Sequence, residues 1–125
     1  MGQLKAPRRL LVLEDEPMIA MLLEYYISDM GHQVAWQAET IVEALGVIEG
    51  HAEIDAALLD MNIRGETSDA VAEALKARRI PFCFITGYGS SVAHTDISVI
   101  GKPFDIAMVQ RAVNMLLAND QDSQV

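Results

Sequence analysis

The sequence has one cysteine, no long apolar run and few basic residues, and each shortage excludes a class of protein. Because Cys83 has no partner within the chain, an intramolecular disulfide is impossible, and we expect a cytoplasmic protein. Cys83 lies in the apolar block PFCFI, which predicts a small buried hydrophobic residue. The longest apolar runs, such as IAMLL at 19–23, are too short to cross a bilayer, and the leader MGQLKAPRR lacks the apolar stretch of a signal peptide.

Acidic residues outnumber basic ones. The chain carries 9 Lys and Arg against 18 Asp and Glu, which gives a formal net charge of −9. This balance argues against a nucleic-acid surface, since such surfaces are basic, and it serves mainly to keep the protein in solution. The length of 125 residues predicts one domain that buries roughly two-thirds of its unfolded surface. We therefore expect a single domain over 1–125, with its core at about 8–119, no output domain, and neither nucleic acid nor membrane as a partner.

Blocks with strand character alternate with blocks of helical periodicity along the chain. Runs rich in Leu and β-branched residues predict strands at 9–15, 32–38, 53–61, 80–87 and 97–102. Apolar residues at helical spacing predict helices at 17–30, 40–50, 68–79 and 104–120. This order of elements predicts right-handed βαβ units and an α/β fold in which helices cover both faces of a parallel sheet.

Local signals mark the ends of several helices. Pro17 suits the first turn of a helix and Gly31 its end, and Ser68 is a plausible N-cap. The segment YGSSVAHTD at 88–96 has poor helix propensity, which predicts a short or irregular fourth helix. The inward face of the first helix is expected to contain Ile19, Leu22, Leu23, Tyr26, Ile27 and Met30, with Met18, Met21 and Tyr25 on its flank.

The histidines and the tryptophan have ordinary structural explanations. His32, His51 and His94 show no metal-ligand spacing, and we expect them to be solvated loop residues. Trp36 lies on the second predicted strand and is expected to pack rather than to recognise a ligand.

Polar residues stand where four of the predicted strands end. Ligands of open α/β sheets bind beyond the carboxyl ends of the strands, so these positions are where a site is expected. The strand ends carry, in chain order, Glu14-Asp15-Glu16, Asp60 with Asn62 two residues on, Thr86, and Lys102-Pro103.

These residue types suit the chemistry of phosphorus. Glu14, Asp15 and Asp60 are carboxylates, which can hold Mg²⁺ (or Mn²⁺) through oxygen ligands. A carboxylate can also attack phosphorus and form an acyl phosphate. The metal and Lys102 would then offset charge on the phosphoryl oxygens, and Thr86 could hydrogen-bond one of them.

Each residue also has a structural interpretation when it is taken alone. Asp15 can serve the N-terminus of a helix, and Asp60 can be a turn residue or a cap. Thr86 can be an ordinary strand residue, and Lys102 a solvated loop lysine. The functional interpretation is favoured because four strand ends carry the right chemistry in the right order.

The segments LVLEDEP, LLDMN, FITGYG and GKPFD together resemble the receiver domains of two-component response regulators, and the resemblance covers nearly the whole chain. It implies a flavodoxin-like (βα)5 fold with a doubly wound parallel sheet in the strand order 2-1-3-4-5. It also implies that Asp60 accepts a phosphoryl group from a phosphohistidine, on a sensor histidine kinase or a histidine phosphotransfer protein.

The resemblance further implies a role for each remaining site residue. Asp15 would bind the metal directly and Glu14 mostly through water, while Asp60 and the backbone carbonyl of Asn62 complete the protein ligands. Thr86 and Lys102 match the switch hydroxyl and the phosphate-binding lysine, and the Lys102-Pro103 bond is expected to be cis.

The chain departs from the family pattern at two positions. Glu14 stands where aspartate is commoner, and Val99 stands three residues before the lysine, where many receivers carry Tyr or Phe as a switch. PFCFITGYG resembles the PFxFATGYG signature of a subgroup of single-domain receivers, and this resemblance implies that an aromatic beside the threonine takes over the switching role. Tyr88 is the candidate for this role here.

The resemblance leaves three functional hypotheses. The first is a stand-alone receiver that is not an enzyme: it catalyses its own phosphorylation from a donor and loses the phosphoryl group slowly. Such a receiver either binds an unidentified downstream protein when phosphorylated or drains phosphoryl groups from its donor. We expect it to be a monomer. The second is a small Mg²⁺-dependent phosphatase with an aspartyl nucleophile, which the amide at Asn62 disfavours because it cannot act as a general acid. The third is a degenerate receiver that only binds partners, which the intact set of Asp15, Asp60, Thr86 and Lys102 disfavours. In the first hypothesis, exposed residues of the first helix such as Met18 and Tyr25 could contact the kinase.

Overall fold

A parallel sheet forms the centre of the protein. The computed structural model describes residues 7–50, 53–87 and 99–122, without the side chains of 119–122. Within these ranges the main sheet contains β1 (Arg9–Leu13), β2 (Gln33–Ala38), β3 (Ala56–Asp60), β6 (Phe82–Thr86) and β7 (Val99–Gly101). Their spatial order is β2-β1-β3-β6-β7, and all neighbours pair in parallel. Since β6 and β7 are the fourth and fifth strands of this sheet along the chain, the predicted flavodoxin-like order is confirmed.

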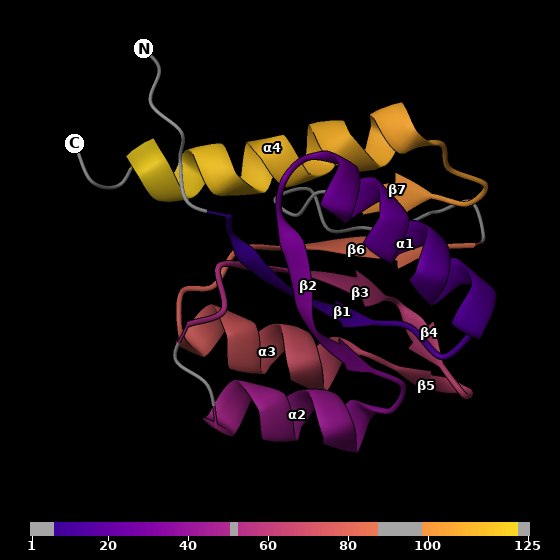
Figure 1. Cartoon of the computed structure of the whole chain (residues 1–125). Helices are drawn as coiled ribbons and strands as arrows, with labels where there is room; N and C mark the ends of the chain where they lie inside the picture. Colours follow the sequence, from indigo (N-terminus) through magenta and orange to yellow (C-terminus); the bar gives the residue numbers. More distant parts are fainter. Residues whose placement is uncertain (1–6, 51–52, 88–98, 123–125) are drawn as a thin grey trace, which may run out of the picture.

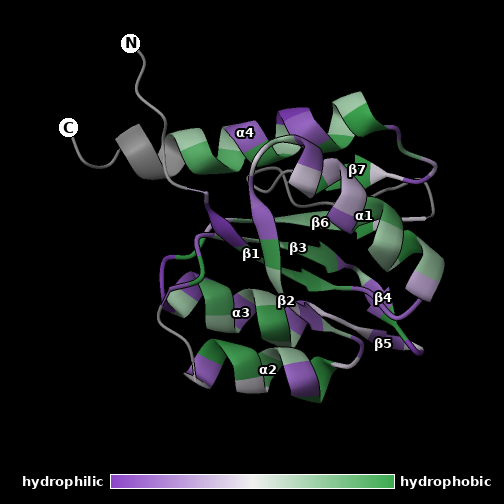
Figure 2. Ribbon diagram, in the orientation of Figure 1, coloured by the Kyte–Doolittle hydropathy of each residue, from purple (hydrophilic) through white to green (hydrophobic). Residues whose placement is uncertain are grey.

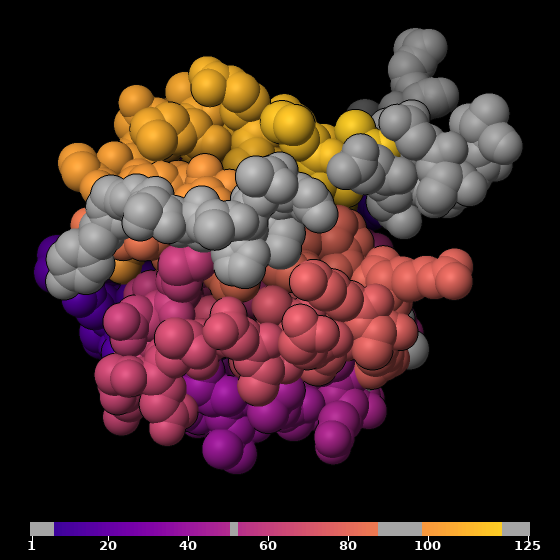
Figure 3. All heavy atoms as spheres, turned by 180° about the vertical axis from the view of Figure 1, so that it is seen from behind, coloured from indigo at the N-terminus to yellow at the C-terminus, as the bar shows by residue number. Residues whose placement is uncertain are grey.

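Helices cover both faces of the sheet (Figure 1). One face carries α1 (Pro17–Asp29) and α4 (Ile106–Asp122), and the other carries α2 (Ile41–Gly50) and α3 (Asp69–Ala77). Figure 3, seen from behind, shows α3 in rose between α2 in purple below it and α4 in yellow above it. No helix in the part of the chain that the structure describes is long and apolar enough to span a membrane.

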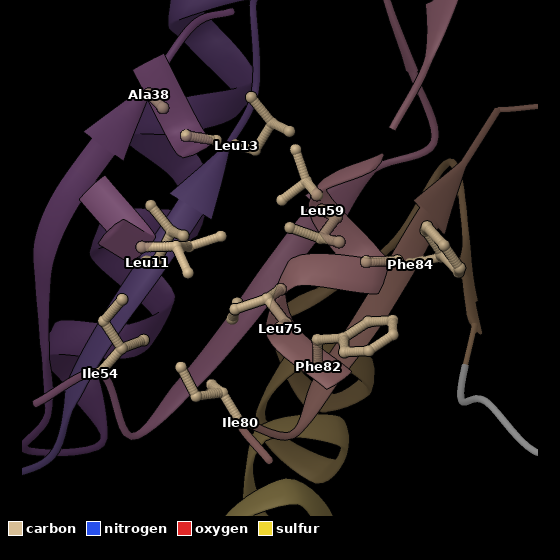
Figure 4. Packing of buried hydrophobic residues seen from close by; sticks show 14 of the residues in the cluster. Leu11, Leu13, Ala38, Ile54, Leu59, Leu75, Ile80, Phe82 and Phe84 are labelled. Atoms are coloured by element: carbon tan, nitrogen blue, oxygen red, sulfur yellow. The ribbon is translucent and has the colours of Figure 1, made fainter. Parts of the chain in front are cut away.

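The two faces of the sheet build two separate cores. Successive side chains of a strand point to opposite faces of the sheet. Leu11 and Leu13 therefore pack toward α2 and α3 in the first core, while Leu10 and Val12 pack toward α1 and α4 in the second core. In the first core, Leu59 of β3 and Phe84 of β6 lie in register on the same face of neighbouring strands (Figure 4). Burial on both faces explains why the middle strands are continuously hydrophobic in Figure 2.

The first helix begins and ends as predicted, but its inward face is shifted. Gly31 follows the helix with φ +87°, a left-handed conformation that glycine adopts without a steric penalty. Ala20, Leu23 and Ile27 are buried, whereas Leu22, which was expected to be inward, is exposed to 37%. The apolar stripe is wider than the contact with the sheet, so the helix can bury only part of it.

A short hairpin between β3 and α3 was not predicted as a pair of strands. β4 (Asn62–Ile63) and β5 (Glu66–Thr67) pair antiparallel around Arg64 and Gly65. Both turn residues have positive φ, at 53° and 85°, as two-residue hairpin turns require. The Arg64-Gly65 turn seen in the sequence is therefore the tip of this hairpin.

Two further expectations need correction, and a third concerns residues outside the described ranges. Ser68 does precede α3, but its buried hydroxyl makes no capping bond and finds no hydrogen-bond partner among the described residues. His32 is half-buried rather than solvated, and its Nδ1 accepts a hydrogen bond from the backbone N–H of Arg8 at 3.1 Å. The expected irregular helix at 88–96 lies outside the described residues.

Two other expectations are confirmed. Cys83 is fully buried, and burial raises the pKa of its thiol to about 12. Trp36 packs against the first core, with the guanidinium of Arg9 4.7 Å from its ring centroid.

Candidate functional site

The carboxyl ends of β1, β3, β6 and β7 meet at one edge of the sheet, where a pocket of about 860 Å³ opens. Its polar lining includes Asp15, Asp60, Asn62, Thr86 and Lys102. Ile19 and Leu22 on α1, together with Phe104, give the pocket an apolar side. The strand-end residues predicted to form a site are thus brought together.

Asp60 ends β3 and presents its carboxylate to this pocket. The residue is only 6% exposed, and its Oδ1 accepts a hydrogen bond from the backbone N–H of Asn62 at 3.2 Å. The next residue, Met61, donates its own N–H to the carbonyl of Ile85 at 2.8 Å, which continues the contact with the end of β6. The N–H of Asn62 therefore orients the Asp60 carboxylate, while the bond from Met61 to Ile85 fixes the backbone beside it.

Three carboxylates gather around this point. Ligand oxygens of Glu14, Asp15 and Asp60 all lie within 4.8 Å of one another. Carboxylates this close repel each other, so a nearby positive charge stabilises the arrangement. The all-oxygen donor set suits a hard divalent cation such as Mg²⁺.

Lys102 supplies one such positive charge. Its Nζ lies 3.3 Å from Oδ2 of Asp60 and 3.7 Å from Oε1 of Glu14. Burial by itself would lower the pKa of Lys102, but the carboxylates of Asp60 and Glu14 outweigh burial and raise it, so the ammonium stays charged. The backbone N–H of Lys102 donates to the carbonyl of Thr86 at 2.8 Å, and the bond from Lys102 to Pro103 is cis, as predicted.

Glu14 is the most deeply buried of the three acids. Its pKa is raised to about 7, mainly by burial and also by the charge of Asp60. The N–H of Glu16, which donates to Oε2 at 3.1 Å, and the charge of Lys102 both act to lower the pKa. Its other oxygen, Oε1, has no hydrogen-bond partner among the described residues. That oxygen lies 3.7 Å from Nζ of Lys102, so it faces the lysine ammonium.

The unpredicted hairpin completes the surroundings of Asp15. Oδ2 of Asp15 accepts a hydrogen bond from the backbone N–H of Arg64 at 3.2 Å, and the Arg64 guanidinium lies 3.7 Å from Oε1 of Glu39. Sequence reasoning missed this link, because the only signal for it was the turn dipeptide Arg64-Gly65.

Of the residues proposed for the switch, Thr86 lines the pocket and Val99 does not. Thr86 is 8% exposed and lies at the end of β6, in register with Gly101 of β7. Val99 lies away from the pocket, 37% exposed, beside Met108 and Met115 in a smaller hollow of about 270 Å³. Tyr88 lies outside the described residues.

Comparisons with known proteins agree on one kind of domain. No known protein-family model matches the chain. The solution structure of SdrG from Sphingomonas melonis Fr1 shares 41% identity, with a TM-score of 0.79, over 91% of this chain and 99% of that one. SdrG is also known in a BeF3-activated conformation, with 39% identity and a TM-score of 0.76 over the same shares of the two chains.

Two PhyR proteins are also similar. The REC domain of the PhyR response regulator from Erythrobacter litoralis shares 28% identity, with a TM-score of 0.80, over 90% of this chain and 92% of that one. The phyllosphere-induced regulator PhyR of Methylorubrum extorquens is 31% identical over an alignment of 121 positions, and the match covers 92% of this chain and 45% of that protein. The chain spans less than half the length of the curated relatives it matches.

Proposed function

Because the chain belongs to the receiver domains of response regulators, we propose that it accepts a phosphoryl group on Asp60 and signals through the phosphorylated state. One observation carries this proposal: the nearly buried carboxylate of Asp60 faces an open pocket, in contact with Lys102 and beside two further acids. A carboxylate placed in this way is accessible to a donor and has a cation beside it to offset new negative charge.

A divalent cation fits this site. Asp15 and Asp60 would hold it through their carboxylates, and Asn62 through its backbone carbonyl, which is a donor set suited to Mg²⁺ or Mn²⁺. The fit is supported by the crowding of three carboxylates, whose oxygens lie within 4.8 Å of one another. When bound, the cation offsets negative charge on the phosphoryl oxygens.

The side chains of the pocket have distinct parts in the transfer. A carboxylate oxygen of Asp60 forms the new bond to phosphorus, while the P–N bond of the donor phosphohistidine breaks; the donor ring carries a proton on its other nitrogen, so it leaves as neutral imidazole. The ammonium of Lys102 stays beside Asp60 and offsets the charge of the phosphoryl group. The hydroxyl of Thr86, at the pocket wall, then donates a hydrogen bond to a phosphoryl oxygen.

The partners follow from this chemistry. The donor is a sensor histidine kinase or a histidine phosphotransfer protein in the cytoplasm, and the phosphorylated chain binds a downstream protein. The activated conformation of SdrG supports two conformations for a domain of this kind, whose populations phosphorylation shifts. Met18 and Tyr25 on α1 are 80% and 63% exposed, and α1 also lines the pocket, so these side chains are placed to contact the donor.

The proposal is tested by chemical phosphorylation. Incubation with acetyl phosphate and Mg²⁺ is expected to add one phosphoryl group, measured by intact mass. An Asp60→Asn chain is expected to stay unmodified, and equal modification of that variant would overturn the assignment of Asp60.

A phosphatase is disfavoured by the residue two positions after the nucleophile. Asn62 occupies the position where a general acid would stand, and its backbone N–H already donates to Asp60. We therefore propose a phosphoacceptor rather than a turnover enzyme. Steady hydrolysis of a generic phosphate ester would contradict this.

A further inference from the structure

Glu14 differs from the other two acids in its relation to the pocket. Asp15 and Asp60 line the open space, whereas the Glu14 side chain is fully buried beneath it and is not part of the lining. Its Oε2 accepts the N–H of Glu16, and its Oε1 faces Nζ of Lys102 at 3.7 Å. Oε2 of Glu14 is therefore bonded to a residue two positions along the chain, and Oε1 faces the ammonium of Lys102.

The backbone on both sides of this contact is fixed by the sheet. The N–H of Glu14 donates to the carbonyl of Ala38 at 3.0 Å, and the Glu14 carbonyl accepts from Nε2 of Gln37 at 3.2 Å. On the other side, the N–H of Lys102 is bonded to Thr86. The two side chains thus extend from backbone that β2 and β6 hold in place, and they meet where Nζ of Lys102 also contacts Asp60.

From this geometry we propose that Glu14 is a positioning residue for Lys102: its buried carboxylate holds the ammonium beside Asp60 and contributes little to binding the divalent cation. This inference rests on the proposed function of Asp60. It gives Glu14 a different main role from the water-mediated metal contact that the family resemblance implies. A lysine anchored by two carboxylates is already in place when the phosphoryl group arrives, so its charge acts without reorganisation.

The two roles of Glu14 predict opposite patterns in a Glu14→Gln chain. If Glu14 positions Lys102, Mg²⁺ affinity stays nearly unchanged, while the phosphorylation rate at saturating Mg²⁺ and acetyl phosphate falls about tenfold to a hundredfold, because the ammonium is misplaced. If Glu14 helps to hold the metal, affinity falls by about tenfold to a hundredfold and saturating Mg²⁺ restores the rate.

The experiment measures both quantities on the same chains. Metal affinity is measured by titration with Mn²⁺, followed through the EPR signal of the free ion, and the rate by intact mass over time. Asp15→Asn provides the comparison for a lost ligand, and Glu49→Gln, at an exposed position on α2, controls for the change in net charge. Weak metal binding with a restorable rate would overturn the inference.

A second measurement separates this inference from the proposed function. In the unsubstituted chain, the Lys102 ammonium is expected to give an NMR signal that exchanges slowly with water, unlike that of the half-exposed Lys76. The signal is assigned by its loss in Lys102→Gln, and it should broaden in Glu14→Gln. Exchange as fast as that of Lys76 would overturn the contact even if Asp60 is phosphorylated. Failure of the unsubstituted chain to take up phosphate would overturn the proposed function alone.

Discussion

The Nζ atom of Lys102 lies 3.3 Å from Oδ2 of Asp60, although 42 residues separate the two along the chain. Asp60 ends β3 and Lys102 follows β7, so the contact exists because both strands end at the same edge of the sheet. The side chains are only 23% and 8% exposed, so water screens their attraction less than it screens a surface pair. This ammonium therefore places a positive charge directly beside the Asp60 carboxylate.

Replacing the lysine should slow phosphorylation without unfolding the protein. We predict that Lys102→Gln reduces the rate of phosphoryl uptake from acetyl phosphate by about a hundredfold, because the developing negative charge loses its fixed cation. The rate is measured by intact mass at saturating Mg²⁺. Lys76→Gln is the matched control, since Lys76 forms only a surface pair with Glu73 on α3. Wild-type rates in Lys102→Gln would exclude the lysine from the reaction.

Asp15→Asn should change stability in opposite directions with and without metal. In EDTA, removal of one of three crowded carboxylates relieves repulsion and should raise the melting temperature by roughly a few degrees. In MgCl₂, the unsubstituted chain gains stability by mass action, and the variant gains much less because it lacks a ligand. Thermal melts of both chains in the two buffers measure this. An equal response to Mg²⁺ would show that Asp15 does not bind the metal.

His32 should make part of the stability depend on pH. Burial lowers its pKa below 6.5, and Arg8 lowers it further, while Asp55 raises it. Folding therefore favours the neutral imidazole, so this contribution is present above about pH 6.5 and is lost as the pH falls through the lowered pKa. His32→Gln keeps an acceptor for the Arg8 N–H but cannot be protonated. As the pH falls, the free energy of unfolding of this variant should therefore decrease less than that of the unsubstituted chain.

Urea unfolding of both chains at about pH 7.5 and about pH 5.5 measures the difference. The comparison between the chains removes the contribution of other groups, such as Glu14, whose raised pKa acts in the opposite sense. An equal loss of stability in both chains would mean that folding does not perturb His32.

Substitution of two glycines by alanine should change the stability of the protein in opposite directions. Gly46 lies in α2 with open space where a Cβ would stand, so Gly46→Ala should stabilise the protein by about 0.5–1 kcal/mol. Gly65 has φ +85°, so Gly65→Ala should destabilise it by about 1 kcal/mol or more, although space is available there as well. Urea unfolding measures both values, and a shared sign would contradict the hairpin geometry.

The chemistry of the site was largely predictable, but its internal arrangement was not. Asp60 and Lys102 could be found because each directly follows an apolar strand, and parallel strands end at one edge. In the run Glu14-Asp15-Glu16, by contrast, no signal distinguishes the first acid from the third. Pairing of Glu14 with Ala38 of β2 buries it, while Glu16 remains exposed.

The same limit applies to α1 and to the hairpin. Helical periodicity identified a broad apolar stripe that includes Leu22, but only the position of the helix over the sheet decides that Ala20 is buried in its place. The two-residue strands β4 and β5 are too short to show any periodicity, so a turn signal was all that the sequence offered.

The sequence by itself determined the order of elements, the parallel sheet and the residue types at the strand ends, because these depend on local patterns and on general rules of chain connection. Only the tertiary structure decided which of those side chains meet. Lys102 lies between Asp60 and Glu14 because of strand register and burial across the whole sheet, and both arise from contacts between residues far apart in the chain.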